Sequence, residues 1–355
     1  MHAALRTSAC DLFGVDYPIV QTGMGWVAGA RLTSATSAAG GLGILASATM
    51  TLSELAAAIA GVKDRTDRPF GVNLRSDQGD VNDRIALLVR ERVRVASFAQ
   101  APGERLVKTL KDAGVVVMPT VGARRHAEKV AEWGVDAVIA QGAEGGGHTG
   151  TVPTSLLLPA VCDAVDIPVL GAGGFCDGRG LVAARAWGAA GIAMGTRFLL
   201  SVESTVPDAV KQKYLEASVT DTVVTKAIDG YPQRVIRTAL VDHLEGVGRF
   251  SALGRSLANA LRFRKLTGRS LADLTREGRA MKAAEGLTWA QVAMAANAPM
   301  LTKAALVDGR LDAGVLPTGQ VVGEISSLPT AAEIIRGIMD EAERTLDLLG
   351  DGENK

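Results

Sequence analysis

Short apolar runs recur between residues 18 and 198, and Gly, Pro or Asp bounds most of them. Most runs are apolar throughout, as expected for strands that are buried on both faces of a parallel sheet. Between them lie helical patterns: residues 52–65 follow Thr51, and residues 124–134 and 178–188 each end in Gly. The runs that predict strands are residues 18–21, 42–46, 70–74, 93–98, 115–121, 136–141, 168–173 and 191–198.

Strands that alternate with helices predict right-handed βαβ units and a parallel sheet. Eight strands within about 200 residues fit a closed (β/α)8 TIM barrel better than an open sheet. We therefore predict an α/β protein built on such a barrel, with an open doubly wound sheet as the alternative.

The alternation of strands and helices stops near residue 213. Residues 214–316 have helical patterns, with helices expected at residues 255–266, 271–286 and 287–300. From residue 318 onward we expect a loop and a helix that returns to the barrel. The predicted organisation is thus a barrel of residues 1–212 and 318–355, capped by a smaller helical domain of residues 213–317.

The composition narrows the class of protein. Lys and Arg number 38 and so do Asp and Glu, which argues against a protein built mainly for nucleic acid or anionic membranes. The three cysteines, Cys10, Cys162 and Cys176, are too far apart for a disulfide framework or a paired metal site. Without a signal-peptide pattern or a membrane-span pattern, we expect a cytoplasmic protein, and a homo-oligomer is possible.

Glycines follow the last two predicted strands, where TIM barrels often bind phosphate groups. Gly173 ends the seventh strand run and Gly174 follows it, and Gly195 and Thr196 lie in the eighth. Glycine amides allow close backbone approach and the threonine adds a hydroxyl donor, so these four residues predict a phosphate site. The alternative is that they form ordinary tight turns. A phosphate site at a glycine-lined barrel mouth suits a phosphorylated substrate or flavin mononucleotide (FMN).

A second glycine-rich loop, QGAEGGGHTG at residues 141–150, carries one imidazole directly after the sixth predicted strand. His148 would lie over the barrel mouth, where it could accept and return a proton, so we predict that it is catalytic. Glu144 could be a second acid, could orient a neighbour, or could be a solvated charge. No metal-ligand spacing accompanies His148, and we expect no metal site.

A run of basic residues without an acidic one lies between residues 246 and 270. It is either a solvated helix face or a binding surface for an anionic group, such as the phosphates of coenzyme A or an acyl carrier. Nucleic acid is a weaker alternative, because only two phenylalanines interleave the charges. The basic residues are Arg249, Arg255, Arg262, Arg264, Lys265 and Arg269.

Together these motifs resemble the nitronate monooxygenase family, formerly called 2-nitropropane dioxygenases, to which FMN-dependent enoyl-acyl-carrier-protein reductases are close relatives. The resemblance implies an FMN in the barrel mouth and makes His148 the counterpart of the family's catalytic base. The matching segments are residues 16–29, 39–47, 68–74, 135–150, 167–180, 195–198 and 318–325. The cofactor-binding residues that it implies are Met24, Asn73, Gln141, Gly146, Gly147, Gly173, Gly174, Gly195 and Thr196.

The family performs several reactions at a carbon next to an electron-withdrawing group. A nitronate is oxidised with O2, and a thioester is reduced or gains a double bond beside its carbonyl. The chain also looks like members of bacterial steroid-ring catabolism that dehydrogenate a hydroxy-methyl-oxo-indane carboxyl-CoA ester. The basic run favours such a CoA ester, with Glu144, Arg249, Arg262, Arg264 and Lys265 as substrate-contact candidates.

We therefore predict an FMN-dependent oxidoreductase acting on a CoA thioester, with NAD(P) or O2 as possible electron partner. The alternatives within the family are a nitronate monooxygenase and an enoyl thioester reductase. A flavin-free isomerase or aldolase barrel is the alternative outside it, although none of the eight strand runs contains a lysine for a Schiff base.

Overall fold

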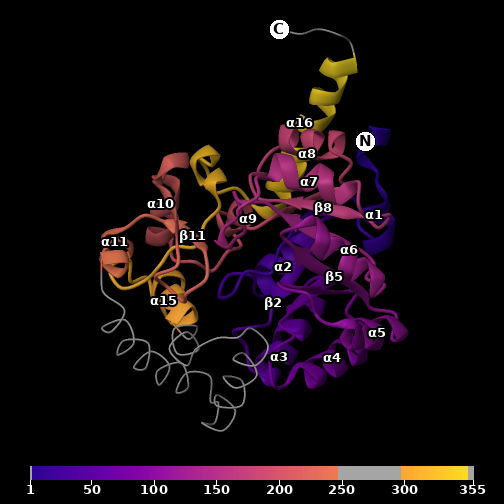
Figure 1. Cartoon of the computed structure of the whole chain (residues 1–355), viewed down its shortest axis with the longest axis horizontal. Helices are drawn as coiled ribbons and strands as arrows, with labels where there is room; N and C mark the ends of the chain where they lie inside the picture. The colour runs from indigo at the N-terminus through magenta and orange to yellow at the C-terminus, as the bar shows by residue number, and fades with distance from the viewer. Residues whose placement is uncertain (1, 247–296, 351–355) are drawn as a thin grey trace.

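The computed structural model describes residues 2–246 and 297–350. Eight parallel strands close into a barrel, in the order β1-β2-β3-β4-β5-β6-β8-β9, and β9 pairs back with β1 (Figure 1). The predicted (β/α)8 barrel is confirmed. Its strands are β1 (Ile19–Gln21), β2 (Leu42–Ala46), β3 (Phe70–Leu74), β4 (Val95–Phe98), β5 (Val116–Val121), β6 (Val138–Gln141), β8 (Val169–Ala172) and β9 (Gly191–Met194).

Each strand is as long as its predicted run or shorter. The prediction was wrong at the last run: β9 ends at Met194, and helix α9 (Thr196–Leu199) follows instead of more strand. The apolar residues of α9 continue the buried run, so hydrophobicity alone did not reveal the change of backbone conformation. Gly173 likewise lies outside β8, because its φ of +92° is left-handed and cannot continue a strand.

Helices cover the outside of the barrel. Helix α3 (Leu52–Lys63) begins with a capping box between Thr51 and Glu54. Gly134 and Gly188 follow α6 (Arg124–Glu132) and α8 (Gly178–Ala186) with left-handed φ of +80° and +90°, as the sequence predicts. The covering helices are α2 (Ala30–Ala38), α3 (Leu52–Lys63), α4 (Val81–Arg90), α5 (Glu104–Asp112), α6 (Arg124–Glu132), α7 (Thr154–Cys162) and α8 (Gly178–Ala186).

The barrel interior is filled by side chains from alternate strand positions. Val20, Ile44, Met118 and Leu170 belong to this buried inner cluster. Helix α1 (Ser8–Phe13), which follows a short 3-10 helix η1 (Ala3–Leu5), adds Phe13 to the same cluster and so closes one end of the barrel. Since the interior is packed, a ligand site must lie at the other, C-terminal end of the strands.

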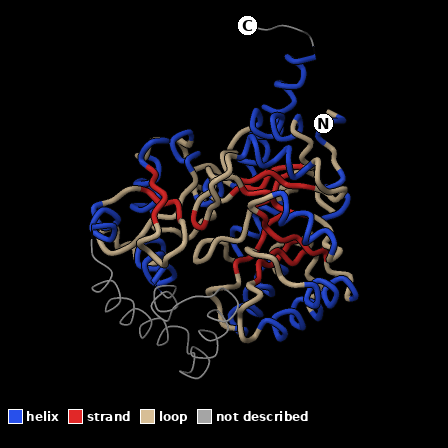
Figure 2. Tube along the Cα trace, viewed as in Figure 1, coloured by secondary structure: helices blue, strands red, loops and turns tan. Residues whose placement is uncertain are grey.

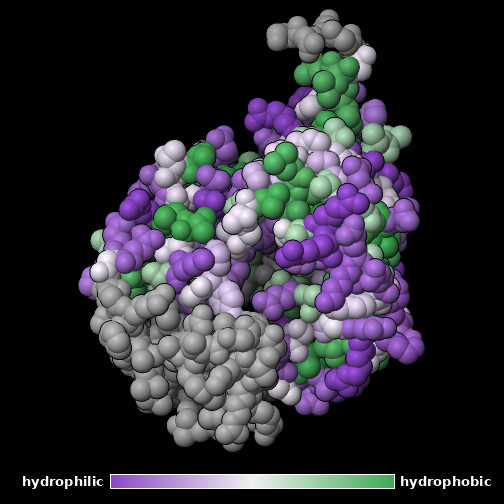
Figure 3. All heavy atoms as spheres, in the orientation of Figure 1, coloured by the Kyte–Doolittle hydropathy of each residue, from purple (hydrophilic) through white to green (hydrophobic). Residues whose placement is uncertain are grey.

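The chain returns to the barrel through 3-10 helix η3 (Gln320–Glu324) and helix α16 (Ala331–Gly350), as predicted. Helix α16 packs against α8 so closely that a Cβ added to Gly178 would lie 2.3 Å from the Ala342 amide nitrogen. Its last turns project beyond the barrel, where the exposed Leu348 and Leu349 form an apolar tip (Figure 3). No helix within residues 2–246 and 297–350 is long and apolar enough to cross a membrane.

We call residues 213–246 and 297–317 the second unit. It contains most of helix α10 (Asp208–Leu215), 3-10 helix η2 (Val219–Asp221), strands β10 (Thr222–Thr225) and β11 (Gln233–Ile236), and helices α11 (Ala239–Gly246) and α15 (Asn297–Leu306). Helix α10 spans the predicted boundary at residue 213, and the division into two domains stays a prediction.

An antiparallel sheet lies apart from the barrel strands (Figure 2), in the order β10-β11-β7, where β7 is the two-residue strand Gly147–His148. The sequence predicted only helices for residues 214–316, which is wrong for β10 and β11. Each has four residues, and each depends on cross-strand pairing that a local pattern does not reveal. The helices expected at residues 255–266 and 271–286, and most of that expected at 287–300, lie outside the described residues.

Candidate active site

Loops after the barrel strands converge at the C-terminal mouth. The loop after β1 lies against the end of β3, since a Cβ added to Gly23 would lie 2.4 Å from the Asn73 Cβ. The same loop also contacts the end of β9, because a Cβ on Gly195 would lie 3.4 Å from Met24 Sδ. The structure therefore brings the predicted residues Met24, Asn73 and Gly195 to one place.

The glycine-rich loop after β6 completes this side of the mouth. A Cβ on Gly173 would lie 2.9 Å from the Gly145 amide nitrogen, and one on Gly146 would lie 2.6 Å from that of Gly319. Gly173 and Gly174 both have left-handed φ, +92° and +84°, which L side chains rarely adopt. Glycine is thus required here both for close approach of backbones and for conformation.

Thr196 holds the returning segment at the same mouth. Its Oγ1 accepts a hydrogen bond from the Gly319 amide at 2.9 Å. A hydroxyl that accepts one bond still has its own hydrogen to donate. Thr196, beside Gly195, can therefore donate a hydrogen bond to an anion at the mouth while its oxygen accepts the bond from Gly319.

Polar side chains line the inner face of the barrel near the mouth. The Asn73 amide donates to Ser97 Oγ at 3.0 Å. Ser97, Thr120 and Gln141 pair in register with Met118, Ile139 and Ala172 of the inner cluster, so they face the same interior. Ser97 and Thr120 were not predicted, although a polar residue at an inward position of an apolar run is a usable signal.

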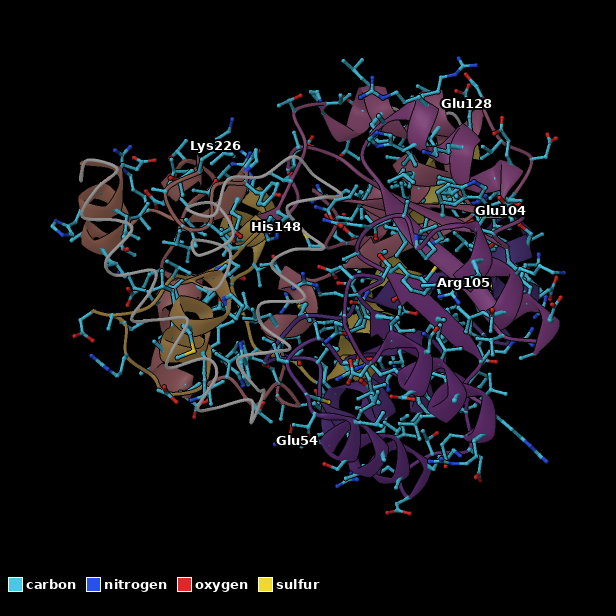
Figure 4. All side chains as sticks on the ribbon, turned by 60° about the horizontal axis from the view of Figure 1, so that its bottom comes forward. Glu54, Glu104, Arg105, Glu128, His148 and Lys226 are labelled. Carbon is cyan, nitrogen blue, oxygen red and sulfur yellow. The ribbon has the colours of Figure 1, made fainter. Side chains whose placement is uncertain are left out.

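His148 lies on the two-residue strand β7 (Gly147–His148), which pairs with β11 of the second unit. Gly147 has a φ of +65°, which sets the backbone just before the histidine. From the barrel side, the Gln141 amide donates to the His148 carbonyl at 2.8 Å. The imidazole side chain is 62% exposed and lies on the side of the second unit that faces the barrel (Figure 4).

A buried carboxylate that the sequence did not predict binds the imidazole. Asp229 Oδ2 lies 2.8 Å from His148 Nε2, and only 3% of Asp229 is exposed. Asp229 belongs to the turn between β10 and β11, 81 residues beyond the histidine. No local signal marks it, because Asp and Gly are ordinary turn residues.

Glu144 is engaged within the protein. Its carboxylate accepts hydrogen bonds from the Thr154 amide at 2.9 Å and the Thr154 hydroxyl at 2.8 Å, at the first residue of α7. A negative charge at this position stabilises the N-terminal end of the helix. Among the roles considered for Glu144, these contacts correspond to orienting a neighbour, and its contact with substrate stays a prediction.

Arg234 fixes the glycine-rich loop from β11. Its buried guanidinium donates to the Ala143 carbonyl and to Thr222 Oγ1, each at 3.0 Å, and burial lowers its pKa. This role of Arg234 was not predicted from the sequence. The basic residues predicted to contact substrate, Arg249, Arg262, Arg264 and Lys265, lie outside the described residues, as do Arg255 and Arg269.

A parallel barrel with glycine loops and a histidine at its C-terminal mouth defines a (β/α)8-barrel enzyme. The sequence model of one family, nitronate monooxygenase, matches residues 6–86 and 81–341. The chain belongs to the nitronate monooxygenase family.

Two similar relatives carry the same name. The chain is 58% identical over 348 residues to the (3aS,4S,5R,7aS)-5-hydroxy-7a-methyl-1-oxo-octahydro-1H-indene-4-carboxyl-CoA dehydrogenase of Rhodococcus jostii (strain RHA1), covering 98% of this chain and 99% of the relative. It is 59% identical over 341 residues to the Mycobacterium tuberculosis dehydrogenase of that name, covering 95% and 96%. A probable nitronate monooxygenase of Staphylococcus haemolyticus is 32% identical over 278 residues, covering 65% and 78%.

Solved structures have the same overall fold. FabK from Thermotoga maritima has a TM-score of 0.80 at 35% identity, covering 98% of this chain and 99% of that one. Nitroalkane oxidase from Streptomyces ansochromogenes has a TM-score of 0.74 at 27% identity, covering 96% and 99%. Since the dehydrogenases, the monooxygenase and the oxidase named here are all oxidoreductases, the chain is an enzyme of this class.

Proposed function

We propose that the chain is an FMN-dependent oxidoreductase that dehydrogenates a CoA thioester beside its carbonyl group. The observation that carries the proposal is the His148 imidazole, held beside a glycine-lined barrel mouth and open to solvent on one side. The names of the two relatives that share 58% and 59% identity support a substituted octahydroindene carboxyl-CoA as substrate.

The residues at the mouth fit FMN. Its phosphate would be held by the amides of Gly173, Gly174 and Gly195 and by the Thr196 hydroxyl. The rings and ribityl chain would lie against Met24, Asn73 and Gln141, with Gly146 and Gly147 nearby. Backbone amides, a hydroxyl and carboxamides suit a phosphate and a polar ring edge, and the nearby Glu144 carboxylate is already bound to Thr154.

His148 would remove the proton from the carbon next to the thioester carbonyl. The thioester makes this C–H bond acidic, and a positioned imidazole base contributes about 100- to 10,000-fold to such a step. The electrons of the broken bond then form the C=C bond to the neighbouring carbon. When bound, FMN supplies the acceptor for the hydride that leaves that neighbouring carbon.

The proposal is tested by loading the protein with FMN and mixing it anaerobically with candidate substrates. The octahydroindene carboxyl-CoA thioester is expected to bleach the flavin absorbance faster than any alkyl nitronate. NAD(P)+ and O2, added afterwards, identify the electron partner by the rate at which absorbance returns.

Two outcomes would overturn the proposal. Rapid bleaching by alkyl nitronates and none by the thioester would make the chain a nitronate monooxygenase, which the 32% identical relative of that name favours. A protein that binds no FMN would instead be a flavin-free barrel.

A further inference from the structure

We propose that Asp229 is a positioning residue that holds the imidazole proton of His148 on Nε2, so that Nδ1 is the atom that takes the substrate proton. The inference rests on the proposed function, which makes His148 the base. It identifies which ring nitrogen does the chemistry and which residue decides this.

The hydrogen bonds around Asp229 leave its carboxylate only as an acceptor. Oδ2 lies 2.8 Å from His148 Nε2 and accepts a second bond from the Gln233 amide at 2.5 Å. Oδ1 accepts the Tyr231 backbone N–H at 3.1 Å. The Gln233 amide nitrogen and the Tyr231 backbone N–H can only donate, so in both of these contacts the carboxylate is the acceptor.

This accepting carboxylate determines the state of the ring. A carboxylate has no hydrogen to donate, so the hydrogen between the two groups must be on His148 Nε2. The Gln233 amide also lies 3.3 Å from Nε2, but an amide nitrogen has no lone pair to accept with, so both nitrogens donate to Asp229. In the neutral imidazole, Nδ1 is then the one nitrogen with a free lone pair.

The second unit fixes the ring from several directions. His148 pairs in register with Gln233 on β11, so backbone and side-chain contacts come from the same strand. The Tyr231 ring meets the imidazole edge-on, with centroids 6.0 Å apart. A base held in this way keeps its orientation at the barrel mouth without a covalent tether.

Among the residues that the structure describes, the other charged groups close in sequence to this pair are directed elsewhere or lie on the surface. Arg234 donates to Ala143, and the Glu144 carboxylate binds Thr154. Lys226, which begins the turn that carries Asp229, is exposed on the second unit (Figure 4). Asp229 is therefore the charged group whose hydrogen bond sets the tautomer.

The test is nitrogen NMR of the full-length protein labelled with 15N-histidine, at a pH of about 8.5, where an ordinary imidazole is neutral. Couplings to the ring carbon-bound hydrogens distinguish Nδ1 from Nε2, and chemical shift shows which carries hydrogen. The chain has four histidines, and the signal lost in a His148→Gln sample identifies His148. We expect Nε2–H with a bare Nδ1; an Nδ1–H tautomer or an averaged pair of signals would overturn the inference.

An amide at position 229 should reverse the tautomer. In Asp229→Asn the new NH2 group can donate to Nε2, which drives the proton to Nδ1. Asp242→Asn is the matched control, since that carboxylate of the second unit is exposed and pairs with Arg237 at 2.8 Å. The wild-type spectrum alone decides the inference should Asp229→Asn fail to fold.

Steady-state kinetics give an independent test of the role of Asp229. We expect Asp229→Asn to lower kcat about 100-fold or more with KM changed less than about threefold, as when a buried aspartate that orients a catalytic histidine is amidated. In a His148→Ala background the same change should have no further effect, because Asp229 acts through the ring. Equal losses in both backgrounds would assign Asp229 a merely structural role.

The tautomer is measured without substrate or turnover. An Nε2–H signal in a protein that does not turn over CoA thioesters would leave this inference intact and would overturn the proposed function. Thioester turnover by a protein with an Nδ1–H signal would support the proposed function and would overturn this inference.

Discussion

A carboxylate placed at Gly174 should expel FMN from the barrel mouth. Gly174 has a φ of +84°, and a Cβ built there would make only ordinary van der Waals contact, with Glu144 Cβ the nearest atom at 3.8 Å. Gly174→Asp would therefore fit sterically and present a negative charge to the proposed phosphate. Gly134→Asp is the matched control, because its φ is +80° and a Cβ there meets nothing within 4 Å.

The two variants separate backbone strain from electrostatics. A left-handed residue other than glycine costs about 1–2 kcal/mol, so both should lose similar amounts of unfolding free energy. Repulsion between unit charges about 4 Å apart, at an effective dielectric constant of about 20, is about 4 kcal/mol. That corresponds to a rise of about 1,000-fold in the Kd for FMN, in Gly174→Asp alone.

The assay is titration of free FMN with apoprotein, followed by quenching of flavin fluorescence, alongside thermal melts. We expect comparable melting temperatures and a large difference in Kd between the two variants. If FMN binds Gly174→Asp as tightly as it binds Gly134→Asp, the phosphate does not lie at Gly174 and the assignment of that loop is refuted.

Three further changes probe other parts of the site. Thr196→Val removes a phosphate donor and should raise the FMN Kd about tenfold by the same titration, whereas an unchanged Kd would remove Thr196 from the site. Glu144→Gln weakens the start of α7 and should lower Tm by about 2 °C while kcat stays within about twofold; a collapse of kcat would make Glu144 a second acid. Burial raises the pKa of the Cys162 and Cys176 thiols to about 11, so alkylation followed by mass spectrometry should be slow at pH 8 and accelerate as the pH rises; rapid labelling at pH 8 would contradict this.

The barrel could be predicted because its strands are buried on both faces. Such strands are apolar throughout, as in residues 42–46 and 70–74, which match β2 and β3 without adjustment. Where a run continued into another buried conformation, as from β9 into α9, hydrophobicity could not mark the change. The mouth residues Met24, Asn73 and Gln141 were named from the family resemblance.

The second unit and the partner of His148 could not be predicted for a different reason. Strands β10 and β11 are stabilised by each other and by β7, which comes from a barrel loop far away in the sequence. Asp229 approaches His148 only once that sheet has formed. Contacts made by tertiary pairing leave no periodicity in the local sequence, so the role of Asp229 could not be predicted from the turn in which it lies.

The most direct test of the central claim is anaerobic single turnover of FMN-loaded enzyme with the octahydroindene carboxyl-CoA thioester. Two forms of the thioester are compared, with hydrogen or with deuterium on the carbon next to the carbonyl. Wild type should bleach the flavin and should do so more slowly with the deuterated thioester, and His148→Gln should bind the same FMN yet bleach at least about 100-fold more slowly. Equal bleaching rates in wild type and His148→Gln would contradict the account, because they would show that His148 does not remove that proton.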